Sequence, residues 1–267
     1  MRVVKELKSP LNRLFIFETE DGYRIESVFY KGERLCVSSQ VGCPVKCLFC
    51  ASGKRGLKRS LTAEEIFLQY EILREKLPIR GVAIAGIGEP SLNADEVVKA
   101  VELLKKEELK VTISTTGYPI SGFEKLIRAP HDGLTISVHS VFPEKRREIF
   151  GLSEDLGEIL AVLEEYRKGV SSSRRKKFQL GYLLIKGLND SEEDLRELGK
   201  IAKEHRMPVM LMAYNPVEGV GLEPLSDEEY ERAFLFLREM GIRVTLSNRF
   251  RRDPLGGCGT LTISREV

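Results

Sequence analysis

Segments whose apolar residues recur every three to four positions, as in a helix, alternate along this chain with short apolar runs that are typical of strands. Residues Thr62–Leu77 place Ile66 and Tyr70 on one face of a helix, and Thr62 with Glu65 forms a capping box at its start. The run Gly81–Ile87 is wholly apolar, which is the pattern of a short strand covered on both faces. The pattern therefore predicts helices and strands in alternation.

The alternation continues towards the end of the chain. We expect helices over Asp95–Lys106, Gly122–Arg128, Leu156–Arg167 and Glu192–Arg206, strands over Lys110–Thr115, Leu134–His139, Phe178–Ile185, Pro208–Ala213 and Ile242–Ser247, and a last helix from Ser226. Strands and helices in this order form a parallel sheet with right-handed crossovers. About six such units are present, too few for an eight-fold barrel. We therefore predict an α/β protein built as a partial (β/α)6 barrel.

The first thirty or so residues follow a different pattern. The runs LFIFETE and YRIESVFY flank Asp21-Gly22, a dipeptide that suits the positive φ angles of a tight hairpin turn. A strand over Arg34–Ser39 follows. We accordingly divide the chain into an N-terminal β-hairpin extension (1–30), the barrel (31–247) and a C-terminal segment (248–267).

Composition sets broad limits on function. The chain has 267 residues, enough for one large domain, with 42% hydrophobic and 31% charged residues. A net charge of +2 excludes no partner, because a nucleic-acid site needs only a local basic face. No apolar stretch approaches about 18 residues and the N-terminus has no apolar signal core, so we expect no membrane and no secretion. The expected compartment is the cytoplasm, where the five cysteines stay reduced unless they carry chemistry or bind metal.

Four of the five cysteines crowd into one segment, and three of them, Cys43, Cys47 and Cys50, form a CxxxCxxC motif. Three thiolates at these offsets hold a [4Fe–4S] cluster and leave one iron open for S-adenosyl-L-methionine (SAM), as in radical SAM enzymes. The alternative is structural zinc, with Cys36 or Cys258 as a fourth ligand. Zinc sites are commonly built from paired CxxC elements, and no second CxxC occurs here.

Polar residues at the predicted strand ends support a SAM site independently of the cysteines. The carboxyl ends of parallel strands form one rim, so these residues should converge on the face that carries the cysteine loop. Glu89 would accept from the SAM ammonium, while serine and asparagine side chains suit its carboxylate and ribose. Each residue alone is weak evidence, since a lone histidine is more often a satisfied core residue. The set is Gly88, Glu89, Ser114, Ser137, His139 and Asn215.

One run of charge, SSSRRKK (171–177), directly precedes a predicted strand. Such runs are usually solvated loops. The alternative is a phosphate-contacting loop at the mouth of the site, in which Arg174, Arg175, Lys176 and Lys177 would strengthen RNA binding.

Taken in order, the motifs resemble those of the RlmN/Cfr family of radical SAM methyltransferases, which methylate adenine in RNA. The resemblance spans about residues 12–261 and rests on CVSSQVGCPVKCLFC, GIGEPSLN, VTISTTG, LTISVHS, the KGLND segment, YNP and a late Cys-Gly. Its most specific part is the Cys-Val-Ser-Ser-Gln that precedes the cysteine motif. The resemblance implies a radical SAM barrel with the clustered cysteines as cluster ligands and the six strand-end residues as the SAM site.

The resemblance also implies a reaction that uses two SAM molecules, because C2 of adenine is electron-poor and resists direct methylation. Cys258 would be methylated first. A deoxyadenosyl radical from the second SAM would then activate that methyl group for addition to the base. Cys36 would release the product by forming a disulfide with Cys258. Glu26, in YRIESV, would accept a proton.

Two departures from the family bear on the substrate. Typical members carry an N-terminal helical accessory domain of roughly ninety residues that helps to engage RNA, whereas this chain begins almost at the hairpin, so we expect a short member without it. The segment Asp253-Pro-Leu-Gly-Gly-Cys258-Gly-Thr also replaces the family's Ile-x-Ala-Ala-Cys-Gly-Gln. In isolation, Cys258 would be interpreted as a spare surface thiol in a glycine loop.

The implied partners are therefore an rRNA or tRNA substrate and an electron donor such as flavodoxin or ferredoxin. The expected product is an adenine methylated at C2, and carbon 8 stays open. Two other functions remain: a radical SAM enzyme of the same scaffold with a different substrate, and a zinc-stabilised RNA-binding module without catalysis.

Overall fold

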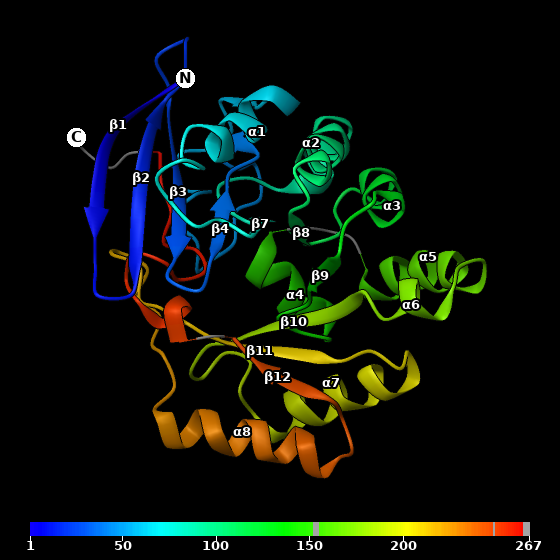
Figure 1. The fold of residues 1–267 in the computed structure, drawn as a ribbon. Helices are drawn as coiled ribbons and strands as arrows, with labels where there is room; N and C mark the ends of the chain where they lie inside the picture. Colours follow the sequence, from blue (N-terminus) through cyan, green and yellow to red (C-terminus); the bar gives the residue numbers. More distant parts are fainter. Residues whose placement is uncertain (152–154, 248, 264–267) are drawn as a thin grey trace.

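A computed structural model describes residues 1–151, 155–247 and 249–263. One sheet organises these residues (Figure 1), in the order β1-β2-β3-β4-β7-β8-β9-β10-β11-β12. The pairs from β1 to β4 are antiparallel, and every pair from β4 to β12 is parallel. The strands are β1 (Arg2–Lys8), β2 (Asn12–Glu18), β3 (Arg24–Tyr30), β4 (Arg34–Val37), β7 (Gly81–Ile84), β8 (Lys110–Thr115), β9 (Gly133–Ser137), β10 (Phe178–Leu184), β11 (Val209–Ala213) and β12 (Val244–Leu246).

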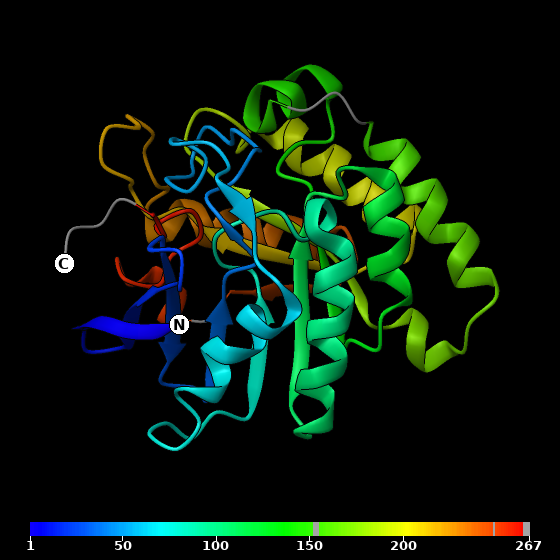
Figure 2. The same ribbon diagram turned by 90° about the horizontal axis from the view of Figure 1, so that it is seen from above.

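Helices cover the outer face of the curved sheet, as Figures 1 and 2 show from two directions. They are α1 (Ala63–Glu71), α2 (Ala94–Lys106), α3 (Ile120–Arg128), α4 (Pro143–Phe150), α5 (Leu156–Lys168), α6 (Ser172–Arg175), α7 (Glu192–Glu204) and α8 (Asp227–Glu239). Each of the six connections between successive parallel strands contains at least one of them, which confirms the predicted partial (β/α)6 barrel. The main core, with Val82, Leu134 and Leu180 fully buried, fills the space between sheet and helices. None of the described helices is long and apolar enough to cross a membrane.

The predicted N-terminal hairpin is confirmed as β2 and β3, which pair from Asn12↔Tyr30 to Glu18↔Arg24. The sequence did not reveal β1, which adds a third strand at the edge of the sheet. No residue of β1 is fully buried, so it lacks the apolar alternation that marks a half-buried strand. Because the sheet continues from β3 into β4, the extension shares its sheet with the barrel.

Two predicted boundaries in the first barrel unit were wrong. The helix expected over Thr62–Leu77 ends at Glu71, because hydrogen bonds between residues three apart, such as Leu73 N–H to Tyr70 O, tighten the chain into turns. The strand expected over Gly81–Ile87 ends at Ile84. The Gly86 N–H then donates to Val37 O, and the chain turns away from the sheet.

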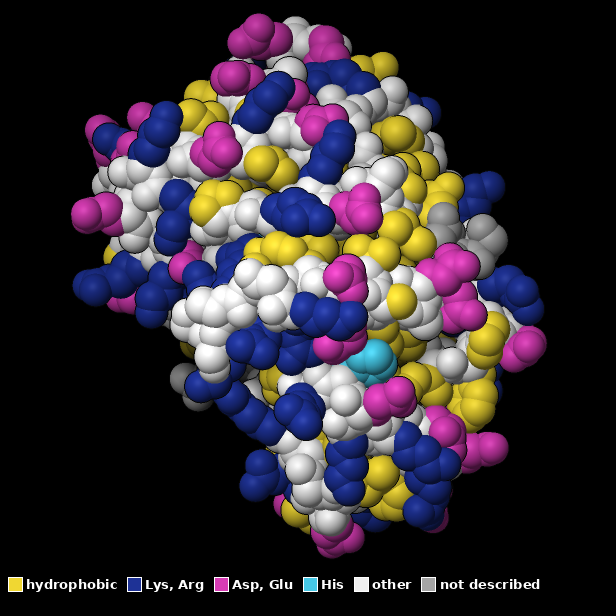
Figure 3. Space-filling view, turned by 90° about the vertical axis from the view of Figure 1, so that its right-hand side faces the viewer, with side chains coloured by type: hydrophobic (Ala, Val, Ile, Leu, Met, Phe, Trp, Pro, Cys, Tyr) yellow, Lys and Arg dark blue, Asp and Glu magenta, His cyan; other side chains and the backbone are white. Residues whose placement is uncertain are grey.

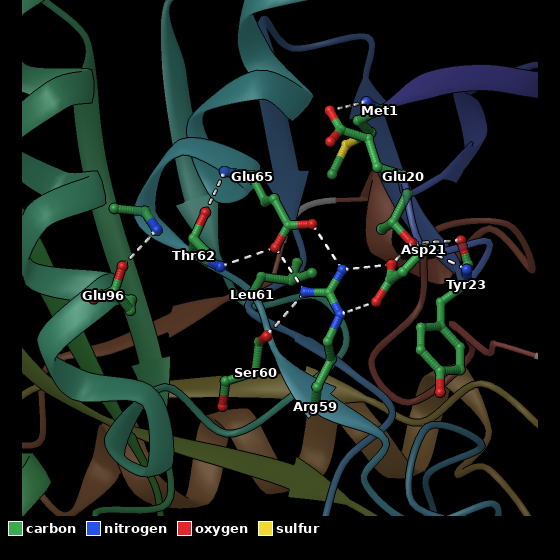
Figure 4. Close-up of polar contacts among 12 residues, drawn as sticks. Met1, Glu20, Asp21, Tyr23, Arg59, Ser60, Leu61, Thr62, Glu65 and Glu96 are labelled. Atoms are coloured by element: carbon green, nitrogen blue, oxygen red, sulfur yellow. Dashed lines mark hydrogen bonds and ion pairs between the residues drawn. The ribbon is translucent and has the colours of Figure 1, made fainter.

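A network of ion pairs centred on Arg59 closes the base of the cysteine loop (Figure 4). The loop lies between two short paired strands, β5 (Gln40–Val41) and β6 (Arg59–Ser60). From β6, Arg59 Nε lies 2.6 Å from the Asp21 carboxylate in the hairpin turn, and its Nη1 lies 2.7 Å from Glu65 in the first turn of α1. Arg59 holds the pKa of both carboxyls below their usual range. The loop is thus anchored to the hairpin and to α1.

The C-terminal segment, residues 249–263, packs against the N-terminal strands. Both ribbon views place it beside β2 and β3 (Figures 1 and 2). Asn12 Nδ2 donates to Phe250 O (2.7 Å), and the Tyr30 hydroxyl donates to Gly256 O (2.9 Å). The N-terminal strands therefore hold the segment that carries the last cysteine.

Candidate active site

A cavity of about 120 Å³ opens at the carboxyl ends of β7, β8 and β9. It brings together most of the residues predicted from the strand ends and the cysteine motif. Among its lining residues are Cys43, Cys47, Cys50, Gly88, Glu89, Ser114, Ser137, His139 and Cys258. Asn215, Cys36 and Glu26 do not line it.

The cysteine loop is held over this cavity by main-chain hydrogen bonds. The Leu48 N–H donates to Ile149 O (2.9 Å) in α4, and the Ala51 N–H donates to Gly259 O (2.8 Å) in the C-terminal segment. Within the loop the Cys50 N–H donates to Cys47 O (3.1 Å). The loop therefore sits between the barrel and the segment that carries Cys258.

Burial dominates the electrostatics of the three thiols of the motif. Burial raises the pKa of Cys43 to about 12, with Glu89 and Cys50 adding to the effect. Burial and the neighbouring thiols raise the pKa of Cys47 well above its usual value, and burial raises that of Cys50. Thiolates at these positions need a cationic partner, which an iron–sulfur cluster supplies.

The donor set fits a cluster better than a single ion. Among the described residues, no three His, Cys, Asp or Glu side chains are grouped to hold one metal ion. A cluster binds each cysteine at a different iron and does not require the sulfurs to converge on one point. The zinc site considered from the sequence therefore has no closed ligand set in the described part of the chain.

Glu89 is buried and held on both carboxylate oxygens. The Thr115 hydroxyl and the Ser91 N–H donate to Oε1, and the Thr116 N–H donates to Oε2 (2.9 Å). Burial nevertheless raises the pKa of Glu89. The preceding Gly88 has φ +113°, and a Cβ there would lie 2.7 Å from the Ser39 hydroxyl, so only glycine fits.

The Ser-Ser-Gln of the CVSSQ motif positions the Glu89 loop. The Ile87 N–H donates to the Ser38 hydroxyl (2.9 Å), and the Glu89 N–H donates to Gln40 Oε1 (2.9 Å). Ser38 is fixed in turn by Gln69 of α1, which accepts from its N–H and donates to its carbonyl. The motif acts as a scaffold for the acid that faces the cavity.

His139 is a neutral side chain in this site. Burial, with Arg146 nearby, lowers its pKa to about 3. The Leu183 N–H donates to Nδ1 (3.0 Å), so the ring carries its proton on Nε2. The ring stacks on Phe150, and its backbone has φ +51°. A positive φ at a residue other than glycine is strained, and such strain concentrates at functional sites. Here the stacking on Phe150, at the end of α4, supports the strained residue.

The two remote cysteines share one arginine. Cys258 lies 3.6 Å from Arg251 Nη1 and 3.7 Å from Met212 Sδ at the cavity wall. Cys36 is buried in β4, and burial raises its pKa to about 11, while Arg251 lowers it and Cys258 raises it. The Arg251 guanidinium also lies over the Tyr30 ring, at 5.7 Å from its centroid. Cys36 and Cys258 thus lie within electrostatic reach of each other.

Asn215 and Glu26 contact the C-terminal segment. Asn215 Nδ2 donates to Arg251 O (2.5 Å), and a Cβ at Gly257 would lie 1.8 Å from the same nitrogen. Glu26 is fully buried on β3, and its Oε2 accepts from the Thr262 N–H (2.9 Å). Both residues therefore hold the segment around Cys258 in place.

Sequence reasoning missed three supports of the site. It did not predict α4, although Pro143 at the first helical position and Gly151 with φ +65° at the C-cap are typical boundary signals. It selected Ser114 and overlooked Thr115, which bonds to Glu89. It also overlooked Arg251, since nothing in the spacing of Arg249-Phe-Arg-Arg252 shows which arginine turns inward.

The prediction of a phosphate loop at the mouth of the site was wrong in its placement. Residues 171–177 precede β10 and lie at the amino ends of the strands, away from the cavity. Arg174 donates to the carbonyls of Ile127, Ala129 and His131 at the end of α3, and Lys177 Nζ donates to His131 O. Arg174 and Lys177 are therefore committed to the fold, whereas Arg175 and Lys176 remain exposed.

Comparison with known proteins agrees with this geometry. The radical SAM superfamily model matches residues 37–199. A radical SAM methyltransferase from Sphaerobacter thermophilus has a similar structure, with a TM-score of 0.86 at 29% identity over 97% of this chain and 80% of that one. SuiB from Streptococcus suis, solved with bound SAM, shares the fold, with a TM-score of 0.62 at 18% identity over 82% of this chain and 51% of that one. Fold and site define a radical SAM enzyme, whose cofactors are a [4Fe–4S] cluster and SAM.

Sequence relatives narrow the class further. A probable dual-specificity RNA methyltransferase RlmN from Thermotoga petrophila is 34% identical over 94% of this chain and 76% of its own length. One from Akkermansia muciniphila is 34% identical over 95% and 76%, and one from Bacteroides fragilis is 32% identical over 94% and 75%. This chain belongs to the RlmN family of radical SAM enzymes.

Proposed function

We propose that this protein methylates an adenine ring carbon, C2, in rRNA, tRNA or both, with methylated Cys258 as the carrier and two SAM molecules per turnover. Its RlmN relatives are named as RNA methyltransferases. The observation that carries the proposal is the position of Cys258, whose side chain lines the same cavity as the three motif cysteines and Glu89. A thiol placed there can receive a methyl group and present it where radical chemistry begins.

Cys43, Cys47 and Cys50 would hold the cluster, which supplies the electron for reductive cleavage of SAM. Glu89 and His139 would orient SAM in the cavity, with Ser114 and Ser137 from the neighbouring strand ends. The Cys258 sulfur attacks the SAM methyl carbon in the first half-reaction, and S-adenosylhomocysteine leaves. Arg251 Nη1, 3.6 Å from the Cys258 sulfur, would donate to that sulfur and hold it in place for the attack.

Cys36 and Glu26 would act in the second half-reaction. After the methylene radical on Cys258 adds to C2, the adduct would lose its unpaired electron to the cluster and its C2 proton to Glu26. The Cys36 thiolate would then attack the Cys258 sulfur, so that an S–S bond forms and the S–C bond breaks with its electron pair on the methylene carbon, which takes up a proton and becomes the methyl group. Neither residue lines the cavity, so the C-terminal segment has to shift first. Gly256 and Gly257 on one side of Cys258, and Gly259 with φ +80° on the other, allow such a movement.

We propose a flavodoxin or ferredoxin as the reductant, and the cytoplasm as the location. Asn215 is proposed to serve the SAM site through the segment that it holds. The division of the chain into residues 1–30, 31–247 and 248–267 is proposed to separate hairpin, radical chemistry and methyl carrier.

Replacing Cys36 with Ala tests the mechanism, because it removes the thiol that breaks the link to the base and leaves Cys258 in place. Protein isolated from cells should carry covalently attached RNA, with the link mapping to Cys258 by nuclease digestion and peptide mass spectrometry. The matched control, Cys258→Ala, should carry neither methyl group nor RNA. Normal turnover of Cys36→Ala without any adduct would exclude the two-cysteine mechanism.

A further inference from the structure

A second cavity, of about 510 Å³, opens at the opposite ends of the strands from the cysteines. Its walls come from the end of α5, from α6, from the end of α7 and from the turn before β12. Most of its lining residues lie in the segments that precede β10, β11 and β12, so it faces the amino ends of these strands. Six of the lining side chains are basic: Arg167, Arg175, Lys176, Lys203, Arg206 and Arg243. No Asp or Glu among the described residues lines it.

Five of these six cations lack an acidic partner within the described ranges. Only Arg167 is paired, with Glu164 at 2.5 Å. Two acids on neighbouring segments have partners outside the groove: Asp132 contacts Lys105 and Lys177, and Glu165 contacts Lys168. The five remaining side chains are exposed to solvent. Figure 3, which faces the side of Figure 1 where α5 and α6 lie, shows Lys and Arg side chains gathered in its lower left part.

This concentration of charge contrasts with the rest of the surface. The whole chain has a net charge of only +2, and many of its Lys and Arg side chains are paired with acids, as in Arg2–Glu18, Lys99–Glu96 and Lys125–Asp95. Five cations that share one groove, with no acid among the described residues that line it, favour the binding of an external anion. Arg174, which precedes Arg175 and Lys176 in the sequence, supplies the structural hydrogen bonds to the end of α3 in that region.

We propose that this groove binds the sugar–phosphate backbone of the RNA substrate, at a second contact remote from the reacting base. The proposal rests on the proposed function, since it names where that RNA is held. Exposed Lys and Arg side chains distributed over four segments suit successive phosphates of a chain, and they carry no base specificity. The site at the carboxyl ends would select the nucleotide, while the groove would supply affinity.

Position favours RNA over an acidic electron-transfer protein. The seven residues of β10 span about 20 Å, and the cysteines lie beyond its other end. A reductant seated in the groove would be separated from the cluster by the length of the barrel, whereas a folded RNA is long enough to contact both ends. The groove also has room for more than one anionic group, at about 510 Å³ against about 120 Å³ for the cavity with the cysteines.

The test compares two triple variants that lose the same charge. The groove variant is Lys176→Gln, Lys203→Gln and Arg243→Gln. The control variant is Lys76→Gln, Lys106→Gln and Arg232→Gln, which removes two lysines and one arginine that are exposed and have no ion pair in the described part of the chain. Fluorescence anisotropy with a labelled, unmodified tRNA transcript would give Kd from about 50 to 300 mM KCl. Thermal unfolding and the cluster absorption of each protein would verify folding.

The groove variant should bind the transcript about tenfold more weakly at about 0.1 M KCl, and the slope of log Kd against log salt should fall by about two to three, one phosphate contact per side chain. The control variant should stay within about twofold of the unmodified protein. If both variants lose the same affinity for the transcript, or if the groove variant loses none, the proposal that the groove binds RNA is wrong and the proposed function stays intact. If the unmodified protein binds no RNA at all, both proposals fail.

Discussion

The polar side chains at the two ends of the parallel strands differ in burial and in their partners. At the carboxyl ends, polar groups such as Glu89 and His139 are buried and bonded to the protein itself. At the amino ends, Arg175, Lys176 and Lys203 are exposed, and no acid of the described residues lines the groove that they share. The first end is preorganised for chemistry in a small space, and the second leaves its charge for a partner to neutralise. In our proposal, the sheet thus places the reaction at one end of its strands and the binding of the RNA backbone at the other.

The largest effect is expected at the carboxyl ends. Changing any one of Cys43, Cys47 or Cys50 to Ala should abolish iron retention and SAM cleavage, because a three-thiolate site has no spare ligand. Iron content and 5′-deoxyadenosine production after anaerobic purification would measure this. Cys258→Ala is the matched control: it removes a thiol from the same cavity and should keep a full cluster. Two ligand variants that still hold a full cluster would contradict the assignment.

At the amino ends, the next effect should separate two adjacent arginines. Arg174→Gln removes a half-buried guanidinium that donates to three carbonyls and to the Tyr166 hydroxyl, so it should lower the free energy of unfolding by about 3 kcal/mol. Arg175→Gln changes an exposed side chain and should stay within about 0.5 kcal/mol. Urea unfolding of both variants measures the difference. Equal stabilities would mean that Arg174 belongs with the groove residues.

The smallest predicted effect is a loss of stability at low pH. It arises from His131, which contacts Arg174. Burial, then Arg174 and Lys177, lower the pKa of His131 to about 3. The folded protein keeps the ring neutral while the unfolded chain takes up a proton below about pH 6.5, so stability is complete above that pH and lost as pH falls. The loss from this group should reach about 2 kcal/mol at about pH 5. His131→Gln should remove that share of the slope between pH 6.5 and 5 and leave the slope between pH 8 and 7 unchanged.

The sequence was most informative where local pattern and tertiary environment agree. The parallel strands are short and apolar, and helix starts such as Ser226 with Glu229 carry a capping box, so the alternation predicted the barrel. The site residues at the strand ends followed from topology, because all parallel strands point the same way. Their convergence on one cavity needed no knowledge of side-chain conformation.

What failed depended on contacts between distant parts of the chain. An edge strand such as β1 is chosen by its partner β2, with no buried stripe of its own. Arg174 and Arg175 are indistinguishable in sequence, and only the end of α3 decides which one is structural. The contact of Asn215 with the C-terminal segment was likewise not predicted from the sequence, and its role in binding SAM stays a prediction.

The C-terminal segment has a consequence for how the protein acquires activity during synthesis. Tyr30 bonds to Gly256 across 226 residues, Glu26 to Thr262 across 236, and Asn12 to Phe250 across 238. Contacts of such sequence separation form late, after the loop between them has been ordered. The Gly259 carbonyl also accepts from the Ala51 N–H in the cysteine loop, so this loop and the carrier thiol reach their final positions together. The site is therefore completed only at the end of synthesis, and a chain that stopped short of residue 258 would lack both the thiol and one of the contacts that hold the cluster loop.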